Sequence, residues 1–121
     1  MEAGNAFKYG RQKHLWVVVS DPALDRKHVV IANMTSDGLD QSCVLDVGDH
    51  VFIEHPTVMR YDRARIESDA ALERLVASGS IILQDPVSPE VLKRIREGAA
   101  ITERIPFGCK EVLIDQSLIE P

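Results

Sequence analysis

The sequence predicts one α+β domain, mostly β, with two helices in its C-terminal half. Short segments rich in valine and isoleucine, separated by turn-forming residues, fill residues 14–66. Such spacing favours a small barrel or sandwich over a parallel sheet. After residue 67 the apolar residues recur with helical spacing. A chain of 121 residues can bury its own core without disulfides, so we treat residues 1–121 as a single domain.

Turn signals bound the predicted strands. Asp21 and Pro22 open the first connection, and Gly48 with Asp49 marks a later turn. Pro56 should lie at a break or an edge, because proline cannot donate a ladder hydrogen bond. The predicted strands are residues 14–20, 28–34, 42–45, 51–54, 57–66 and 80–84, with a further candidate at 111–114.

The two predicted helices have recognisable ends. Ser68 can cap a helix over residues 68–79, where Gly79 supplies a left-handed stop. Ser88 can cap a second helix over residues 89–98, which begins with proline at its first position. Residues 1–12, which precede the first predicted strand, are expected to form an N-terminal arm with some mobility.

The charge is unevenly distributed. The net charge is −5, which argues against a protein that binds nucleic acid over its whole surface. However, residues 7–20 contain three basic side chains and no acid, and residues 57–66 contain three arginines against Asp62. The excess of acid lies elsewhere in the chain, so a local basic site is compatible with the acidic total.

Several classes of protein have no support in the sequence. The longest apolar runs, residues 15–19 and 29–32, are far short of the roughly 18 residues of a membrane span. The first residues lack the pattern of a signal peptide, so we expect a cytoplasmic location. No nucleotide-binding or serine-hydrolase motif occurs, so no cofactor is expected. Cys43 and Cys109 are interpreted as reduced thiols, although the sequence leaves a disulfide open.

Three arginines within residues 60–65 form the first candidate binding segment. Arginine binds phosphate through two parallel hydrogen bonds. Asp62 could orient a guanidinium or transfer a proton. On a regular strand alternate residues share a face, which would separate Arg60 from Arg65 and place Arg63 with Arg65. The alternative is a solvated strand face with local ion pairs.

Hydroxyls and cations nearer the N-terminus give two further candidates. Thr35 and Ser36 end a predicted buried strand, where they could bind phosphate or close a turn. Cations interleaved with aromatic residues suit single-stranded RNA, which is bound by stacking and phosphate contacts. An exposed arm is the alternative for this second set, which consists of Lys8, Arg11, Lys13, His14 and Trp16.

Two histidines and two acids lie within residues 48–55. Imidazole and carboxylate together suit zinc, and a metal-assisted hydrolase using His50, Glu54 and His55 is one interpretation. The spacing does not match a known metal motif, so no metal ligand is assigned. A turn with surface histidines, or a pH-sensitive or catalytic histidine, are the other interpretations.

Taken in order, four segments resemble the PemK/MazF-like toxin family. They match that family's first strand motif, its hydroxyl-ended strand, its R-x-D-x-x-R strand and its C-terminal helix. The four segments are residues 14–20 (HLWVVVS), 30–36 (VIANMTS), 60–65 (RYDRAR) and 89–98. The resemblance spans about residues 13–100. Each motif is weak alone, and their order and spacing carry the resemblance.

The resemblance implies a small SH3-like barrel and a homodimeric toxin. Such a toxin cleaves single-stranded RNA without a metal, by attack of a 2′-hydroxyl on phosphorus, and is neutralised by an acidic antitoxin protein. Carried over residue by residue, it implies as catalytic residues His14, Thr35, Ser36, Arg60, Asp62 and Arg65. The residues assigned to RNA binding are Lys8, Arg11, Lys13, Trp16 and Arg63.

The chain departs from the family pattern at its start. His14 and Leu15 replace the arginine and proline of the first motif. The family also begins with a strand and a long loop, for which only about a dozen residues remain here. These departures predict a truncated or absent first strand, and they motivate a second hypothesis: a non-catalytic SH3-like module that binds protein or nucleic acid.

Overall fold

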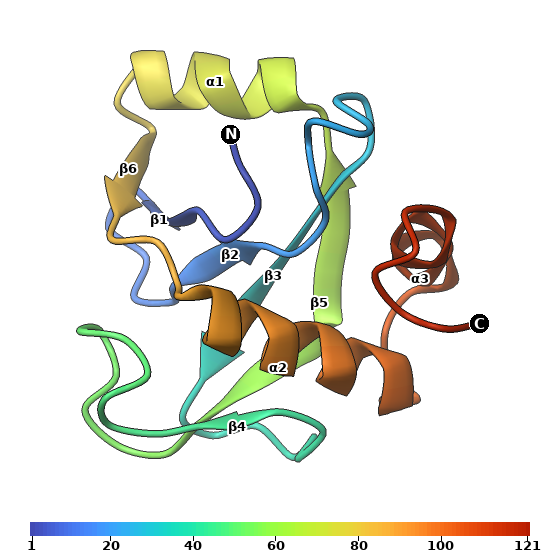
Figure 1. Ribbon diagram of the computed structural model, residues 1–121. Helices are drawn as coiled ribbons and strands as arrows, with labels where there is room; N and C mark the ends of the chain where they lie inside the picture. The colour runs from blue at the N-terminus through green and yellow to red at the C-terminus, as the bar shows by residue number, and fades with distance from the viewer.

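The computed structural model describes residues 1–121 and contains one open six-stranded antiparallel sheet with three helices (Figure 1). The strand order is β4-β5-β3-β2-β1-β6, so β4 and β6 are free edges. The predicted α+β class is confirmed, while closure into a barrel stays a prediction. The elements are β1 (Ala6–Tyr9), β2 (Trp16–Val18), β3 (Val29–Thr35), β4 (Val44–Leu45), β5 (Thr57–Glu67), β6 (Ile81–Gln84), α1 (Asp69–Ala77), α2 (Pro89–Ile101) and α3 (Phe107–Asp115).

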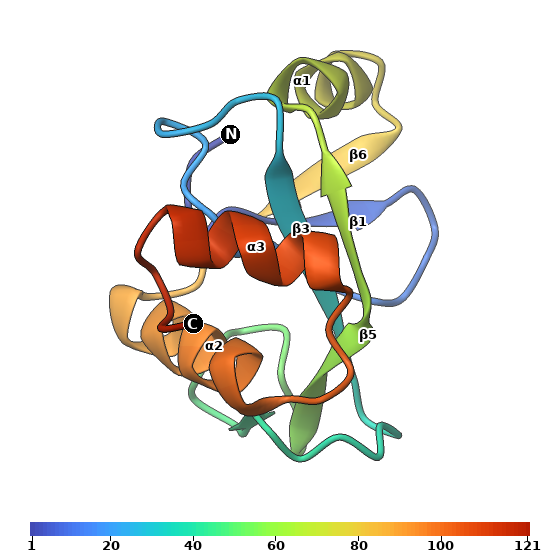
Figure 2. The ribbon, with the colours of Figure 1, turned by 90° about the vertical axis from the view of Figure 1, so that its right-hand side faces the viewer.

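Helices pack on both faces of the sheet. Figure 2 shows α3 lying across β3 and β5 with α2 beside it. On this face the larger apolar cluster joins Val17 and Met59 to Ile95 and Leu113 of the helices. On the opposite face Leu72 of α1 packs in a smaller cluster formed largely by β1, β2 and β3. None of the helices is long and apolar enough to cross a membrane.

The helix ends follow the sequence signals. The hydroxyl of Ser68 accepts a hydrogen bond from the Ala71 N–H at 3.1 Å, and Gly79 has φ of +81° after α1. The hydroxyl of Ser88 accepts from the Val91 N–H at 3.1 Å. The two predicted helices are therefore confirmed, and α2 extends beyond residue 98 to Ile101.

Two predicted strands are wrong. Residues 51–54 form turns, because the Ile53 and Phe52 N–H groups both bond back to His50. Residues 111–114 lie in α3, a third helix. Valine and isoleucine favour strands, but Cys109 and Leu113, four residues apart on one side of α3, are both buried against the sheet.

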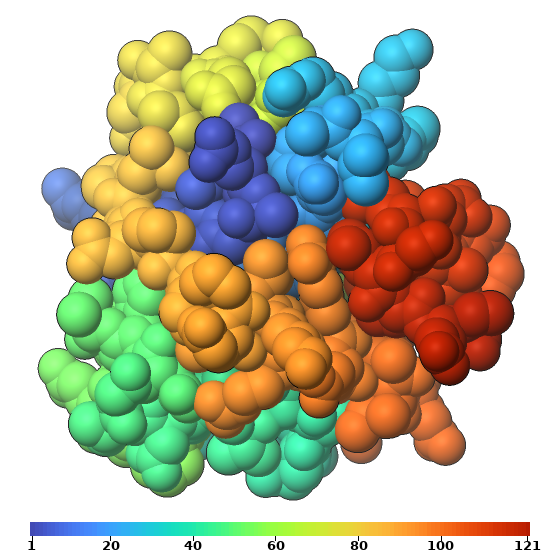
Figure 3. Space-filling view, in the orientation of Figure 1, coloured from blue at the N-terminus to red at the C-terminus, as the bar shows by residue number.

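The N-terminal segment supplies a strand that the sequence analysis missed. β1 pairs with β2 on one side and with β6 on the other, with Ala6 opposite Val17 and Tyr9 opposite Ile81. The segment expected to form an arm therefore occupies an internal position in the sheet. Space filling shows its dark-blue residues packed between α1 and α2 (Figure 3).

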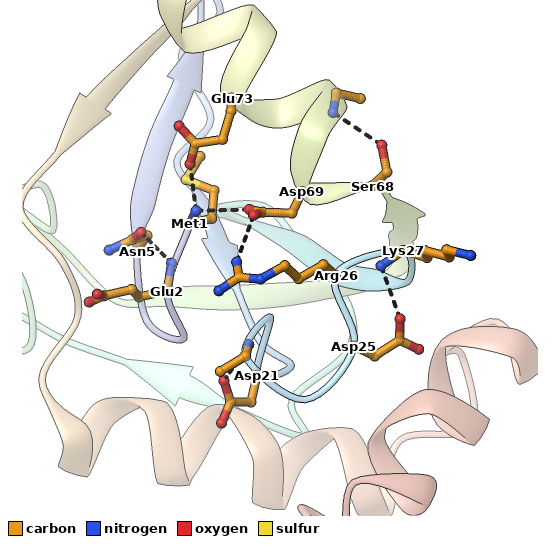
Figure 4. A network of polar contacts seen from close by, with 12 residues as sticks. Met1, Glu2, Asn5, Asp21, Asp25, Arg26, Lys27, Ser68, Asp69 and Glu73 are labelled. Atoms are coloured by element: carbon orange, nitrogen blue, oxygen red, sulfur yellow. Dashed lines mark hydrogen bonds and ion pairs between the residues drawn. The ribbon is translucent and has the colours of Figure 1, made fainter.

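The first residue is tied to α1 by charges (Figure 4). The Met1 amine lies 2.8 Å from the Asp69 carboxylate and 2.5 Å from that of Glu73, and Arg26 donates to Asp69 at 2.9 Å. Burial opposes ionisation of Asp69, but the hydrogen bonds and charges of the amine and of Arg26 outweigh it. They hold the pKa of this carboxyl below its ordinary value.

The pairing of β5 with β3 is irregular. Arg65 lies opposite Ile31, and Arg60 lies opposite Asn33. Between these two pairs β3 advances by two residues, whereas β5 advances by five. Tyr61 and Ala64 consequently both enter the larger core. Ile31 and Asn33 share a face, and their partners share it too. The prediction that Arg60 and Arg65 point to opposite faces is therefore wrong, because regular alternation was assumed across a bulge.

Gly98 allows α2 to approach β5 closely. The Tyr61 hydroxyl donates to the Ile95 carbonyl at 2.6 Å. A Cβ added at Gly98 would collide with the Tyr61 hydroxyl oxygen and lie 2.7 Å from the Cys43 Cβ. These neighbours are buried, so the contact leaves no room for a methyl group.

We therefore predict that Gly98→Ala lowers the free energy of unfolding by about 1–3 kcal/mol, because overpacking outweighs the helical preference for alanine. Gly108→Ala in α3 is the matched control, since its added Cβ meets only Ile66, at 3.8 Å; it should be neutral or stabilising. Urea unfolding of both variants measures the difference. Equal stability for the two would contradict the close approach of α2.

Candidate functional site

A groove of about 970 Å³ opens beside the sheet. Its walls come from residues 10–14 of the β1–β2 connection, residues 34–37 at the end of β3, and the segment before β5. Figure 3 shows that last segment (green) directly beneath β6. The groove brings together six of the residues that the sequence singled out: Lys8, Arg11, Lys13, His14, Thr35 and Ser36.

The groove carries an excess of positive charge. Three basic residues, Lys8, Arg11 and Lys13, line it together with two acidic residues, Asp37 and Glu54. The Lys8 ammonium lies 4.7 Å from the centre of the Phe52 ring, a cation–π contact. The local balance therefore favours an anionic ligand, although the chain is acidic as a whole.

His14 and the two hydroxyls stand at the start of β2 and the end of β3. The His14 Nδ1 lies 3.3 Å from the Met34 carbonyl oxygen. A carbonyl can only accept, so Nδ1 carries the hydrogen and Nε2 is left free. The Thr35 hydroxyl accepts weakly from the Asp37 N–H at 3.3 Å, and Ser36 is exposed. Both the turn and the phosphate interpretations of Thr35 fit this contact.

Arg60 and Asp62 lie outside the groove lining and bind each other. Arg60 donates to the two Asp62 carboxylate oxygens at 2.8 and 2.7 Å. These hydrogen bonds hold the pKa of the Asp62 carboxyl below its ordinary value despite partial burial. A Cβ at Gly38 would lie 3.2 Å from the Thr35 methyl and 3.5 Å from the Arg60 Cδ. Gly38 therefore lies between the Arg60 stem and the Thr35 methyl, while the Arg60 guanidinium is paired with Asp62.

Trp16 and Arg65 also lie outside the groove, and the Arg65 guanidinium stacks over the Trp16 ring. The Arg65 guanidinium lies 4.7 Å from the Trp16 ring centre and 5.1 Å from that of Tyr9. Trp16 is only 6% exposed, so its ring is not open to a base in this arrangement. Arg65 also pairs with Glu67 at 3.2 Å, whereas Arg63 is exposed on the bulge and forms no ion pair.

Three polar atoms on this covered face have no hydrogen-bond partner. They are the Tyr9 hydroxyl, the Trp16 indole N–H and the Asn33 side-chain oxygen. A buried group left unpaired costs about 1–3 kcal/mol. Trp16 pairs in register with Asn33, which lies opposite Arg60. The candidate residues therefore fall into two neighbouring groups, one open in the groove and one closed beneath Arg65.

The histidines predicted as alternatives for a metal site have separate environments. His50 is buried; its Nε2 donates to the Asp85 carbonyl at 2.6 Å and its Nδ1 accepts from the Phe52 N–H at 3.0 Å. It anchors the groove wall. His55 lines the groove, and Glu54 is also present there. No group of three or more histidine, cysteine or acidic residues is arranged to hold a metal ion, and both cysteines are free and buried.

Phe52 is the groove residue that sequence reasoning missed. The segment 51–54 was expected to be a strand, which would have sent its side chains to alternate faces of the sheet. Its turn instead places Val51, Phe52 and Glu54 in the groove. Two histidines and an aromatic residue in so short a segment were the available signal.

Searches of family models, of curated proteins and of solved structures give no match to this chain. The residues that line the groove are therefore the evidence from which we infer a function. Cations, hydroxyls and an imidazole with a free nitrogen form a set that can bind a phosphodiester and move a proton beside it.

Trp16 is the only tryptophan, so its fluorescence reports on the cover formed by Arg65. We predict that Arg65→Ala increases collisional quenching of Trp16 by acrylamide severalfold, because the guanidinium shields the ring. Arg63→Ala, an exposed arginine on the same strand, should leave quenching unchanged. Equal quenching in the wild type and Arg65→Ala would show that Arg65 does not shield the indole.

Proposed function

We propose that this protein is a metal-independent endoribonuclease that cleaves single-stranded RNA in the groove. The observation that carries the proposal is the meeting of His14, Thr35 and Ser36 with three basic side chains in one groove. These residues come from two segments, 8–14 and 35–36, and the sequence indicated phosphate or RNA binding for both segments. We further propose that the chain is a divergent PemK/MazF-like protein, with its open sheet derived from an SH3-like barrel.

Single-stranded RNA fits the groove better than a duplex. Phe52 is an aromatic residue on which an unpaired base would stack once the Lys8 ammonium, which lies over its ring in the free protein, turns to a phosphate. Lys13 and Arg11 supply the charge that a phosphodiester needs. A duplex would hide its bases from Phe52, so both features favour a single strand.

The proposed reaction is attack by the ribose 2′-hydroxyl on the adjacent phosphorus. The bond from phosphorus to the 5′-oxygen breaks, giving a 2′,3′-cyclic phosphate and a 5′-hydroxyl. The free Nε2 of His14 moves a proton in this reaction, and Lys13 stabilises the charge that develops on phosphorus. The hydroxyls of Thr35 and Ser36 orient the phosphate.

Arg60 and Asp62 are proposed to join the site when RNA binds. The Arg60 side chain and the Thr35 methyl both lie near Gly38, and Arg60 is paired with Asp62 in the free protein. A phosphate at the hydroxyl end of the groove would compete with Asp62 for the guanidinium. Arg65 and Trp16 would extend the RNA-binding surface if their contact opened.

The cationic groove also fits an acidic protein segment. We propose an acidic antitoxin as a protein partner that competes with RNA for the groove, a homodimer as the assembly, and the cytoplasm as the location. Charge complementarity supports the first of these. The dimer and the location follow from the proposed family.

A non-catalytic module that binds RNA or protein is the second candidate. The ion pair of Arg60 with Asp62 and the cover of Arg65 on Trp16 favour it, because two of the arginines proposed as catalytic are engaged elsewhere. This candidate predicts saturable, salt-sensitive RNA binding without cleavage.

We predict that the wild type cleaves a mixed-sequence single-stranded RNA in excess EDTA. Lys13→Ala should slow cleavage about 10²-fold, because a preorganised charge at the phosphate is lost. Lys93→Ala is the matched control, since Lys93 is exposed on α2 outside the groove. Cleavage is followed by gel electrophoresis of end-labelled RNA.

Intact RNA after prolonged incubation with folded wild type would reject the ribonuclease. Saturable binding of the same RNA would then favour the non-catalytic module. Equal slowing by Lys13→Ala and Lys93→Ala would place the reaction outside this groove.

A further inference from the structure

We propose that His55 is a second proton-transfer residue of the groove, acting with His14 on one phosphodiester; this inference rests on the proposed ribonuclease. Cleavage through a 2′-hydroxyl needs one group to take a proton and another to give one. His14 alone cannot do both in the same step. The groove contains a second imidazole suited to the task.

The four histidines fall into two pairs. Two of them line the groove with a free ring nitrogen, and the other two do not line the groove. His50 is buried and uses both ring nitrogens on backbone groups. His28 lies 3.0 Å from the Asp25 carboxylate and outside the groove. Only His14 and His55 are both exposed and part of the groove lining.

His14 and His55 are held in the same way. Each Nδ1 faces a backbone carbonyl oxygen, that of Met34 at 3.3 Å and that of Pro56 at 3.4 Å. The contacts are long, but a carbonyl accepts only and so favours the hydrogen on Nδ1. The Nε2 atoms of both rings are consequently available for proton transfer.

The two imidazoles stand on separate segments of the groove. His14 follows the β1–β2 connection, and His55 ends the segment that His50 anchors. The other charged groups that line the groove around them are Lys8, Arg11, Lys13, Asp37 and Glu54. Both imidazoles line one groove, and the proposed step requires that they reach the attacking and the leaving oxygen of the same phosphate.

The step balances without a further reactant. One neutral imidazole takes the 2′-hydroxyl proton as the oxygen bonds to phosphorus. The other, protonated imidazole gives its proton to the 5′-oxygen as the bond from phosphorus breaks. The two rings finish with their protonation states exchanged, and water later restores them.

The test measures single-turnover cleavage of a mixed-sequence single-stranded oligoribonucleotide in EDTA from pH 5 to 9. The wild type should give a bell-shaped profile, because the proposed step needs one neutral and one protonated group at the same time. His55→Ala should lower the maximal rate by roughly 10²–10⁴-fold and abolish one limb. His14→Ala should abolish the other limb, and His28→Ala should match the wild type.

Two further readouts separate chemistry from structure. Free imidazole added to His55→Ala should restore part of the cleavage rate. Such a rescue shows that the variant lacks a proton-transfer group, because imidazole in solution would not correct a packing defect. His55→Gln, which keeps a polar side chain, should unfold at the wild-type temperature yet cleave as slowly as His55→Ala.

The failures of the two proposals are distinguishable. Wild-type rates and both pH limbs in His55→Ala, with RNA still cleaved, would overturn the role of His55 and leave the ribonuclease standing. A wild type that leaves RNA intact at every pH would overturn both.

Discussion

The irregular pairing of β5 with β3 is the constraint on which both the core and the site depend. Between the two paired positions, β5 advances by five residues while β3 advances by two. As a result, the side chains of Tyr61 and Ala64 both point into the larger core. The Tyr61 hydroxyl reaches the α2 backbone there, at the point where Gly98 brings the helix close. The same irregularity places Arg60 and Arg65 together on the other face. One local departure from regular pairing thus arranges a helix and two arginines.

The groove depends on segments that are irregular but anchored. His50 is buried and hydrogen-bonded on both ring nitrogens, which fixes the turns that carry Phe52 and His55. The β1–β2 connection begins and ends in paired strands, and the Gly10 N–H at its start donates to the Ser80 carbonyl at 2.9 Å. Loops positioned by a rigid scaffold are where binding residues concentrate. A groove of this kind can keep its side chains in place without being part of the sheet.

Local signals predicted much of the fold and part of the site. The capping residues Ser68 and Ser88 and the stop at Gly79 located two helices correctly. The β5 irregularity, β1 and α3 depend on contacts with residues distant in the sequence. Local propensity does not predict such contacts. The same division holds in the site: residue type pointed to His14 and Thr35, whereas the placement of Phe52 follows from turns closed by His50.

In the proposed reaction the groove directs a ribose 2′-hydroxyl at its own phosphate. The most direct measurement compares two end-labelled oligoribonucleotides in EDTA, identical except for a single 2′-deoxy nucleotide at the mapped cleavage site. We predict that the all-ribose strand is cut to a 2′,3′-cyclic phosphate and a 5′-hydroxyl, and that the deoxy strand survives at that position. Cleavage of the deoxy strand there, or a 5′-phosphate on the product, would contradict it.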